Sequence, residues 1–180
     1  MRLTRCAVDI RVPAFGKTGV ERQMKLDARD LEILNVLASE GRMTKAELAE
    51  RIGLSASPCW ERLRRLEDAG FIEGYQARIS LRKLGPHVTV FVAVELSDHT
   101  AASFRAFEGA IQRHGEVTGC WALGGGFDYL MQVVTRDIES YQRLIDELLE
   151  ARIGLARYFS YVVTKSVKSP QLPPLEIFAG

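Results

Sequence analysis

The residues best suited to bind a partner lie in the stretch 54–70, LSASPCWERLRRLEDAG. This stretch predicts a helix, because it has a polar start, a proline in its first turn and a glycine stop. Cys59, Leu63 and Leu66 recur at helical spacing, so we expect them to share one face that packs on a core. The other side carries polar and charged groups, namely Ser57, Glu61, Arg64 and Arg65.

The outward groups of this helix suit DNA. We expect one of the Ser55 and Ser57 hydroxyls to cap the helix, and either could instead bond a phosphate oxygen. Arg64 and Arg65 are expected to meet phosphates, and one of them could fork onto a guanine edge. Hydroxyls at the start and arginines outside are typical of a helix laid in the major groove. The alternative is an ordinary solvated amphipathic helix.

Two side chains of the same helix have two interpretations each. Arg62 flanks the apolar face, where it could contact DNA or pair with a carboxylate of its own domain. Trp60 could cover the edge of the domain or pack on a sugar or a thymine methyl, and we favour packing.

Two further helices are predicted upstream. Residues 27–38 form the first, with Asp27 and Asp30 in its first turn and a following Gly41. Its apolar side is predicted to hold Leu31, Leu34, Val36, Leu37 and Ala38. Thr44 and Glu47 make a capping box for a short second helix, which Gly53 ends. The inward residues of this second helix are predicted to be Leu48, Ala49 and Ile52. With the 54–70 helix, this spacing indicates a helix-turn-helix.

The rest of the chain alternates between strand and helix patterns. Residues 71–80 have strand character and could form a short wing, and the Gly85-Pro86 pair marks a domain boundary. Strands are then predicted over 88–96, 116–123, 127–135 and 155–165, and helices over 100–114 and 137–152. This βαββαβ order is the ferredoxin-like motif, so the fold class is α+β. The second of these helices is predicted to turn Tyr141, Leu144, Ile145, Leu148 and Leu149 inward.

Composition limits the classes of protein that fit. The 180 residues are 47% apolar and 26% charged, with a net charge of +1, which predicts no strong non-specific attraction to nucleic acid. The local net charge is +3 over residues 1–23, +1 over 24–85 and −3 over 86–180. Cys6, Cys59 and Cys120 have no disulfide or zinc spacing, and no apolar run could span a membrane. We expect reduced thiols and a cytoplasmic protein without metal or cofactor.

The expected domain order follows. Residues 1–23 are expected to be a disordered extension and show no signal-peptide pattern, although a basic arm that touches phosphates is the alternative. Residues 24–85 are the predicted winged helix-turn-helix domain with its linker, 86–168 the ferredoxin-like domain, and 169–180 a tail. The histidines show no ligand spacing, so His87, His99 and His114 are expected at surfaces or boundaries.

From residue 25 to about 168 the chain resembles the Lrp/AsnC family of transcription regulators. The resemblance rests on two motifs, LSxSPCxERLRRLExxGFIxGY over 54–75 and GxFDY over 125–129. It implies a winged-helix DNA-binding domain followed by an amino-acid-sensing domain whose sheets pair into dimers and larger rings. Thr44, Ser55, Ser57, Pro58, Trp60, Glu61, Arg64 and Arg65 are the expected DNA-binding residues.

The resemblance also implies an effector cleft between subunits. Its residues would be Ala122, Gly124, Gly125, Gly126, Asp128, Tyr161, Val162 and Val163. Glycine N–H groups could meet a ligand carboxylate, or the glycines could simply serve a turn that needs positive φ. Asp128 could hold a ligand ammonium or tie down the turn, and we favour the ligand. Relatives often carry an acidic residue where this chain has Gly126, which favours a neutral or acidic ligand over a basic one.

The expected function is therefore a sequence-specific regulator of amino-acid metabolism or transport. It would bind imperfect palindromes in double-stranded DNA, respond to a small amino acid, and assemble as a homodimer that builds tetramers or octamers. No nucleophile–base pair or phosphate-gripping loop supports catalysis. The rival is an enzyme on the same layout, a decarboxylase that acts on sirohaem derivatives, because a fold does not fix a function.

Overall fold

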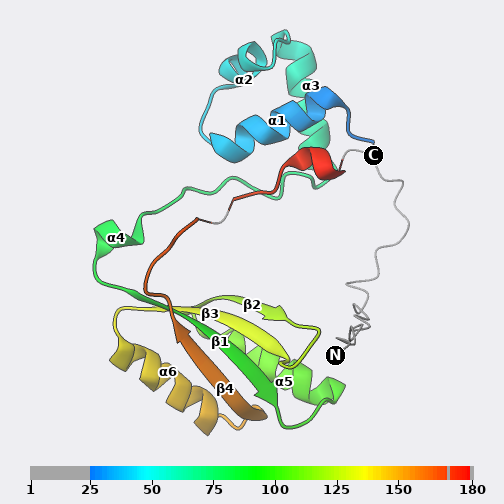
Figure 1. Ribbon diagram of the computed structural model, residues 1–180. Helices are drawn as coiled ribbons and strands as arrows, with labels where there is room; N and C mark the ends of the chain where they lie inside the picture. Colours follow the sequence, from blue (N-terminus) through cyan, green and yellow to red (C-terminus); the bar gives the residue numbers. More distant parts are fainter. Residues whose placement is uncertain (1–24, 170, 179–180) are drawn as a thin grey trace, which may run out of the picture. The chain divides into compact units, whose positions relative to one another are not determined.

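The computed structural model describes residues 25–169 and 171–178, and it divides into two compact units (Figure 1). Of the described residues, the N-terminal unit holds 25–79, 168–169 and 171–178, and the C-terminal unit holds 80–167. The division falls between Ile79 and Ser80, ahead of the Gly85-Pro86 pair. The expected extension over 1–23 lies outside the described residues.

Three helices form the N-terminal unit: α1 (Ala28–Ser39), α2 (Lys45–Arg51) and α3 (Ala56–Asp68). Asp27 and Asp30 make a capping box at the start of α1. Thr44 and Glu47 make the predicted one at the start of α2, where the two bonds measure 2.6 and 3.2 Å. Each box satisfies amide groups that have no partner within their helix. The three helices of the prediction are confirmed.

Two glycines fix the ends of α2 and α3. Gly53 has φ +63° and Gly70 has φ +74°, a left-handed conformation that suits glycine. The Leu54 N–H donates to the Ala49 carbonyl at 2.9 Å, and the Phe71 N–H donates to the Leu66 carbonyl at 3.0 Å. Both are Schellman closures, and the first makes the tight turn that delivers the chain to the start of α3.

The N-terminal core is small. Its buried members are Ile33, Leu48, Ala49, Ile52, Cys59, Leu63 and Leu66, which confirms the predicted inner face of α3. The prediction for α1 was partly wrong, because Ala38 is exposed and Ile33 is fully buried. The buried residues of α1 are Asp30, Leu31 and Ile33, so its inner face lies in the first two turns and includes a charged residue.

The predicted strand over residues 71–80 is wrong. No strand occurs between Phe71 and Ser80, and Tyr75 and Ile79 are more than half exposed. A strand needs a hydrogen-bonding partner, and the described chain pairs nothing with this segment. A short helix that was not predicted, α4 (Leu81–Leu84), follows it.

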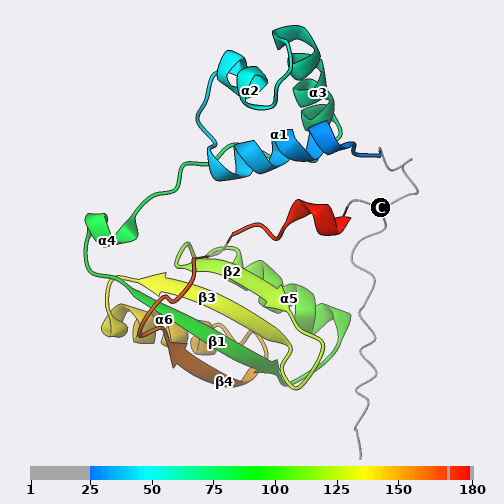
Figure 2. The same cartoon turned by 45° about the horizontal axis from the view of Figure 1, so that its top comes forward.

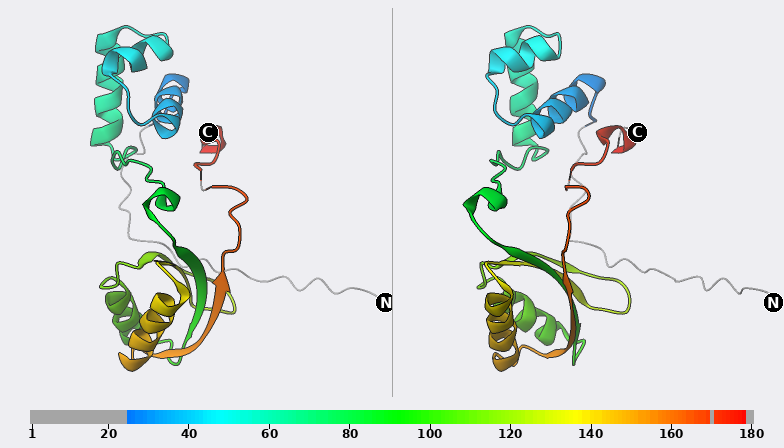
Figure 3. Two further views of the ribbon diagram at one scale, coloured as in Figure 1. Left: turned by 90° about the vertical axis from the view of Figure 1, so that its left-hand side faces the viewer. Right: turned by 60° about the vertical axis from the view of Figure 1, so that its left-hand side comes forward.

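The C-terminal unit is the predicted ferredoxin-like domain. Its strands are β1 (Val88–Leu96), β2 (Val117–Ala122), β3 (Tyr129–Thr135) and β4 (Leu155–Val162). They lie in the order β2-β3-β1-β4 with every neighbouring pair antiparallel (Figure 2). The helices α5 (Ala101–Ile111) and α6 (Ile138–Glu150) cover the same face of the sheet (Figure 3). Capping bonds from the Thr100 and Asp137 side chains begin these helices.

The two faces of the sheet differ in burial. The face under the helices holds a continuous apolar core, with Val90, Val92, Val94, Tyr129, Met131 and Val133 at 5% exposure or less. The opposite face carries Phe91, Trp121, Leu130, Phe159 and Tyr161, as the strand register requires. Trp121, Phe159 and Tyr161 are 49%, 43% and 56% exposed. On α6 four of the five inward residues are confirmed, but Leu149 is 42% exposed.

The end of the chain belongs to the N-terminal unit. A 3-10 helix, η1 (Leu175–Phe178), lies against α1, and the Asn35 amide donates to a Glu176 carboxylate oxygen at 3.1 Å (Figure 1). The described part of the predicted tail is therefore docked on a helix. None of the helices in the described chain is long and apolar enough to cross a membrane.

Candidate DNA-binding surface and effector site

The start of α3 presents unused hydrogen-bond donors. Ser55 occupies the N-cap position, but no side chain makes a capping bond there, so the cap expected from Ser55 or Ser57 is wrong. The N–H groups of Ala56 and Ser57 have no acceptor among the described residues, and Pro58 has no N–H. Two backbone donors and two exposed hydroxyls therefore point away from the helix, where an anion such as a phosphate fits.

The outer side of α3 is exposed along its length. Ser57, Pro58, Trp60, Glu61 and Arg64 all face solvent. The Arg64 side chain is 70% exposed, and within the described part of the chain its one ionic contact is with Asp68, at 3.7 Å. A pair this open is weak and easily exchanged, so the guanidinium is available to a partner.

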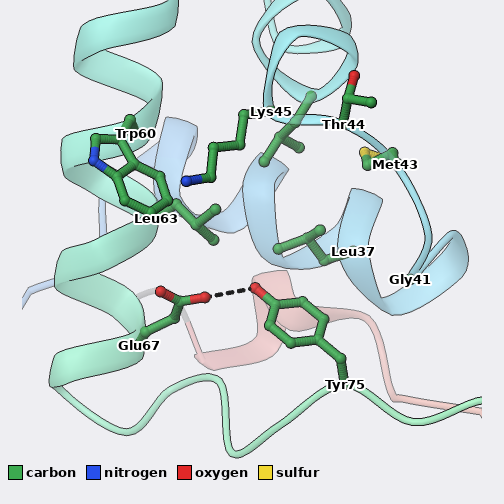
Figure 4. Close-up of a pocket in the computed structure, with 10 residues that line it drawn as sticks. Leu37, Gly41, Met43, Thr44, Lys45, Trp60, Leu63, Glu67 and Tyr75 are labelled. Carbon is green, nitrogen blue, oxygen red and sulfur yellow. Dashed lines mark hydrogen bonds between the residues drawn. The ribbon is translucent and has the colours of Figure 1, made fainter.

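Trp60 packs at the edge of the unit, as favoured. The Lys45 ammonium lies 3.0 Å from the centre of the indole ring (Figure 4). Beneath them is a cavity of about 350 Å3, whose apolar lining includes Leu37, Met43, Leu48 and Leu63. The indole is still 38% exposed, so the packing leaves part of the ring accessible.

Arg62 and Arg65 are paired with carboxylates of the same unit, with 29% and 47% of their side chains exposed. The Arg62 Nη1 donates to Asp27 at 2.6 Å and to Asp30 at 2.8 Å, which settles its two interpretations in favour of the carboxylates. The Arg65 Nη2 donates to both oxygens of Asp30. Arg65 is exposed, as expected for the outer side of α3, but its guanidinium is paired with Asp30. The bond from Arg62 is the main cause that lowers the pKa of Asp27.

The glycine turn between β2 and β3 is open. None of Gly124, Gly125 and Gly126 has a positive φ, and a methyl group placed on any of them would meet nothing within 4 Å. The turn-based interpretation of these glycines is wrong for that reason. The turn is closed instead by the Leu123 N–H, which donates to the Asp128 carbonyl at 2.8 Å. The glycine backbone is thus accessible to a small group.

Asp128 is already engaged within the chain. Its Oδ2 accepts the Leu96 N–H at 2.8 Å, and its Oδ1 lies 3.0 Å from the His99 Nε2. His99 was expected at a surface or a boundary; it is exposed, and it is also a partner of this carboxylate. The tie to the end of β1 is present, and a carboxylate with its several acceptor positions has room for a further donor.

A single chain does not bring the whole predicted effector set together. Asp128 lies beside Leu96 at one end of β1, whereas Tyr161 pairs with Phe91 and Val162 with Val90. Along the strand this separation is about 16 Å. Ala122 pairs with Tyr129, next to Asp128, and the glycines lie in the turn between them. Tyr161, Val162 and Val163 lie beside Phe91, Val90 and Thr89, toward the other end of β1.

Known protein families match each of the two units described above. A model of winged helix-turn-helix DNA-binding domains matches residues 26–73, and the Lrp/AsnC ligand-binding-domain model matches residues 89–173. The transcriptional regulatory protein DoeX of Halomonas elongata is 54% identical over 147 residues, which are 82% of this chain and 93% of the relative.

The chain belongs to the Lrp/AsnC family of transcriptional regulators.

Two further relatives extend the comparison. The proline dehydrogenase transcriptional activator of Rhizobium radiobacter is 39% identical, with 79% of this chain and 92% of the relative covered. The solved structure of a transcriptional regulator from Neisseria meningitidis in complex with L-Met is 33% identical, covers 85% of this chain and 99% of its own, and has a TM-score of 0.79. This Lrp/AsnC protein is therefore a DNA-binding regulator and not an enzyme, and the decarboxylase alternative is set aside.

The cysteines of the Lrp/AsnC chain offer no reactive thiolate among those described. Burial raises the pKa of the Cys120 thiol to about 11, and burial also raises that of Cys59. Close to Cys120, the Tyr129 hydroxyl donates to Glu108 at 2.7 Å, and burial raises the pKa of this phenol first, followed by the contact with Glu108. In residues 25–169 and 171–178, no three His, Cys, Asp or Glu side chains group as metal ligands would.

Sequence reasoning missed three contacts of the site, namely the Arg65 pair with Asp30, the His99 contact with Asp128 and the Lys45 contact with Trp60. One of them had a signal. Asp30 shares its helix face with Ile33 and Leu37, and a charge in an apolar stripe indicates a buried partner. The other two join residues that no helical or strand period relates.

Proposed function

We propose that α3 is the element that reads DNA. The residues that would contact the duplex are all exposed: Thr44, Ser55, Ser57, Pro58, Trp60, Glu61 and Arg64. The Thr44 hydroxyl and backbone also serve the cap of α2. The Ala56 and Ser57 N–H groups and the serine hydroxyls would bond phosphate oxygens near the start of the helix. Arg64, further along the helix, would meet a phosphate or the edge of a guanine.

The observation that carries this proposal is the uncapped, exposed start of α3. A helix start without partners is unfavourable for an isolated protein, since a serine cap contributes typically ~1 kcal/mol. Such free N–H donors are available to a ligand that supplies the acceptor atoms. A phosphate backbone supplies oxygens at that position in helix-turn-helix complexes.

The test uses DNA from upstream of the protein's own gene. At low salt and micromolar protein, the full chain should retard this fragment more strongly than an unrelated one. Arg64→Ala should weaken binding and reduce the salt dependence by about 0.9 for each phosphate that the side chain no longer neutralises. Equal retardation of both fragments by the wild type would contradict sequence-specific binding.

We also propose that the protein acts as a symmetric assembly. The outer face of the sheet, with Trp121, Phe159 and Tyr161 exposed beside Phe91 and Leu130, has the aromatic character of an interface core. A homodimer joined there would present two copies of α3, so operators should be imperfect palindromes with half-sites about one helical turn apart. Such dimers would build tetramers or octamers. Light scattering of the full chain should give at least a dimer, and a monomer would contradict the assembly.

The effector is proposed to be a small amino acid held between subunits. A ligand carboxylate would meet N–H groups of Gly124, Gly125 and Gly126, and its ammonium would meet Asp128. Its side chain would lie against Ala122 and, from a neighbouring subunit, Tyr161, Val162 and Val163. The separation of these two groups within one chain supports a site shared by two subunits. The relative solved with L-Met supports an amino-acid ligand.

Asp128→Asn tests this site better than a larger change. An asparagine keeps an acceptor for the Leu96 N–H but loses the charge that an ammonium needs. A thermal-shift screen of L-Met and the other common amino acids should first find a stabilising ligand. The Asp128→Asn variant should then show no shift with that ligand, while its DNA binding without ligand stays within a few-fold of the wild type. An unchanged shift would place the ligand elsewhere.

The regulated genes are proposed to belong to amino-acid metabolism or transport. A relative named as an activator of proline dehydrogenase supports this assignment. The protein would act in the cytoplasm, because chromosomal DNA is its partner. The ligand would change DNA affinity by favouring one assembly or one spacing of the DNA-binding units over another.

A further inference from the structure

Asp30 is the only charged residue of the described chain that is fully buried. Its relative exposure is 0%, in the first turn of α1 beside the core of the N-terminal unit. One oxygen accepts the N–H of Asp27 at 3.0 Å. A carboxylate without water is stable only when paired and hydrogen-bonded, so its partners are as important as the group itself.

The partners of Asp30 come from α3. Arg65 donates from Nη2 to the two oxygens at 2.8 and 2.7 Å. Arg62 donates from Nη1 to Asp30 at 2.8 Å and to Asp27 at 2.6 Å. We call these four residues the Asp30 cluster. Two guanidinium groups face two carboxylates, so the formal charges of the Asp30 cluster balance.

Adjacent arginines of α3 therefore differ in availability. Arg64 is 70% exposed and, among the residues that the structure describes, has only the 3.7 Å contact with Asp68. Arg65 is 47% exposed and is held by a fully buried carboxylate. Arg62 is 29% exposed and is held by two carboxylates. A sequence with three arginines in four positions thus places one free guanidinium on the surface of α3.

We propose that Asp30 is a positioning residue for DNA recognition, which fixes α3 on α1 and keeps Arg65 from the phosphates so that Arg64 alone is presented. The inference rests on the proposed use of α3 to read DNA. It adds a consequence for specificity. Sequence-independent affinity grows with each phosphate that a cation neutralises. Two guanidiniums kept in the Asp30 cluster lower that affinity and leave a larger share of binding to contacts with bases.

The first experiment compares the two neighbours directly. Arg64→Met and Arg65→Met remove the same charge one residue apart, and binding of each full-length variant to operator and to unrelated DNA is measured over a range of salt. Arg64→Met should flatten the plot of log affinity against log salt by about 0.9 per half-site, and Arg65→Met should leave its slope unchanged. Equal flattening by both would overturn the proposal.

The second experiment releases Arg65. Asp30→Asn keeps the shape of the side chain but removes its charge, so Arg65 is free to reach a phosphate. The salt slope should steepen by about 0.9 per half-site, and the ratio of operator affinity to unrelated-DNA affinity should fall several-fold. A purely structural role would lower the folded fraction without steepening the slope, and an unchanged slope in the folded variant would overturn the proposal.

The double variant Asp30→Asn with Arg65→Met covers the case in which a single change prevents folding. Removing both partners leaves no unpaired buried charge, so this variant is the easier one to fold. Its slope should equal that of the wild type. A slope about 0.9 lower per half-site would show that Arg65 contacts DNA and would overturn the proposal. Failure of the proposed function looks different, because then Arg64→Met also leaves operator binding unchanged.

Discussion

The two units of this regulator position their functional groups by different means. In the N-terminal unit, three short helices share a core of seven buried apolar residues, and a charge-balanced cluster links α1 to α3. In the C-terminal unit, strand pairing and a core of fifteen buried residues hold the sheet and its helices. One unit presents hydrogen-bond donors and a free arginine, and the other presents an aromatic sheet face. A small core leaves the first unit dependent on individual contacts.

The largest expected effect is in the small core. Leu66 is fully buried where α3 meets the other helices, so Leu66→Ala should cost about 2–5 kcal/mol, a large share of the stability of so small a unit. Calorimetry of the variant should show an early transition for the N-terminal unit and a second near the wild-type temperature. A single transition at a lower temperature would show that the two units unfold together, and would contradict the proposed difference between them.

Next comes the aromatic sheet face. Phe159→Asp places a charge in the proposed interface and should weaken self-association about a hundredfold, or ~2.7 kcal/mol. Leu149→Asp on α6 is the matched control, because Leu149 is 42% and Phe159 43% exposed. Sedimentation should show dissociation of the first variant only. Dissociation of both, or of neither, would mean that the outer sheet face is not the interface.

A smaller effect is expected at Gly119, on the same face. A Cβ there would lie 2.5 Å from the ring of Trp121, so Gly119→Ala must displace the indole and should cost about 1–3 kcal/mol. Gly109→Ala in α5 is the control, since its Cβ would meet nothing within 4 Å. Thermal unfolding and tryptophan fluorescence should both change in the first variant, and an unshifted midpoint would refute the close contact.

The smallest effect concerns acid. The pKa of Asp27 is lowered mainly by the bond from Arg62, so this carboxylate stabilises the fold above its unfolded pKa of about 3.9 and loses that effect as pH falls through its lower folded value. Asp27 is half exposed, so the contribution should be below about 1 kcal/mol. The unfolding midpoint of the wild type should therefore fall more steeply below pH ~4 than that of Asp27→Asn. Equal pH dependence of the midpoint in the two proteins would show that Asp27 does not contribute to stability in this way.

The same contrast explains what could be predicted from the sequence. Periodic patterns and caps are local signals, and they predicted the bounds of β1 to the residue and those of α3 to within two. The prediction of a wing strand was wrong because residues 71–80 have the composition of a strand but pair with no other strand in the described chain. Arg65 was assigned an outward role from its helical position, and Asp128 a ligand role from the family resemblance. Their actual partners, Asp30 and His99, lie 35 and 29 residues away, beyond any local period.

The central claim is that the exposed start of α3 meets DNA, and hydrogen–deuterium exchange of the full chain tests it most directly. In the free protein the Ala56 and Ser57 amides lack acceptors among the described residues and should exchange rapidly. With operator DNA, we expect strong protection of peptides that cover residues 55–65, and little change in β1 or α6. Protection confined to residues 86–168, with the start of α3 still exchanging rapidly, would contradict the account.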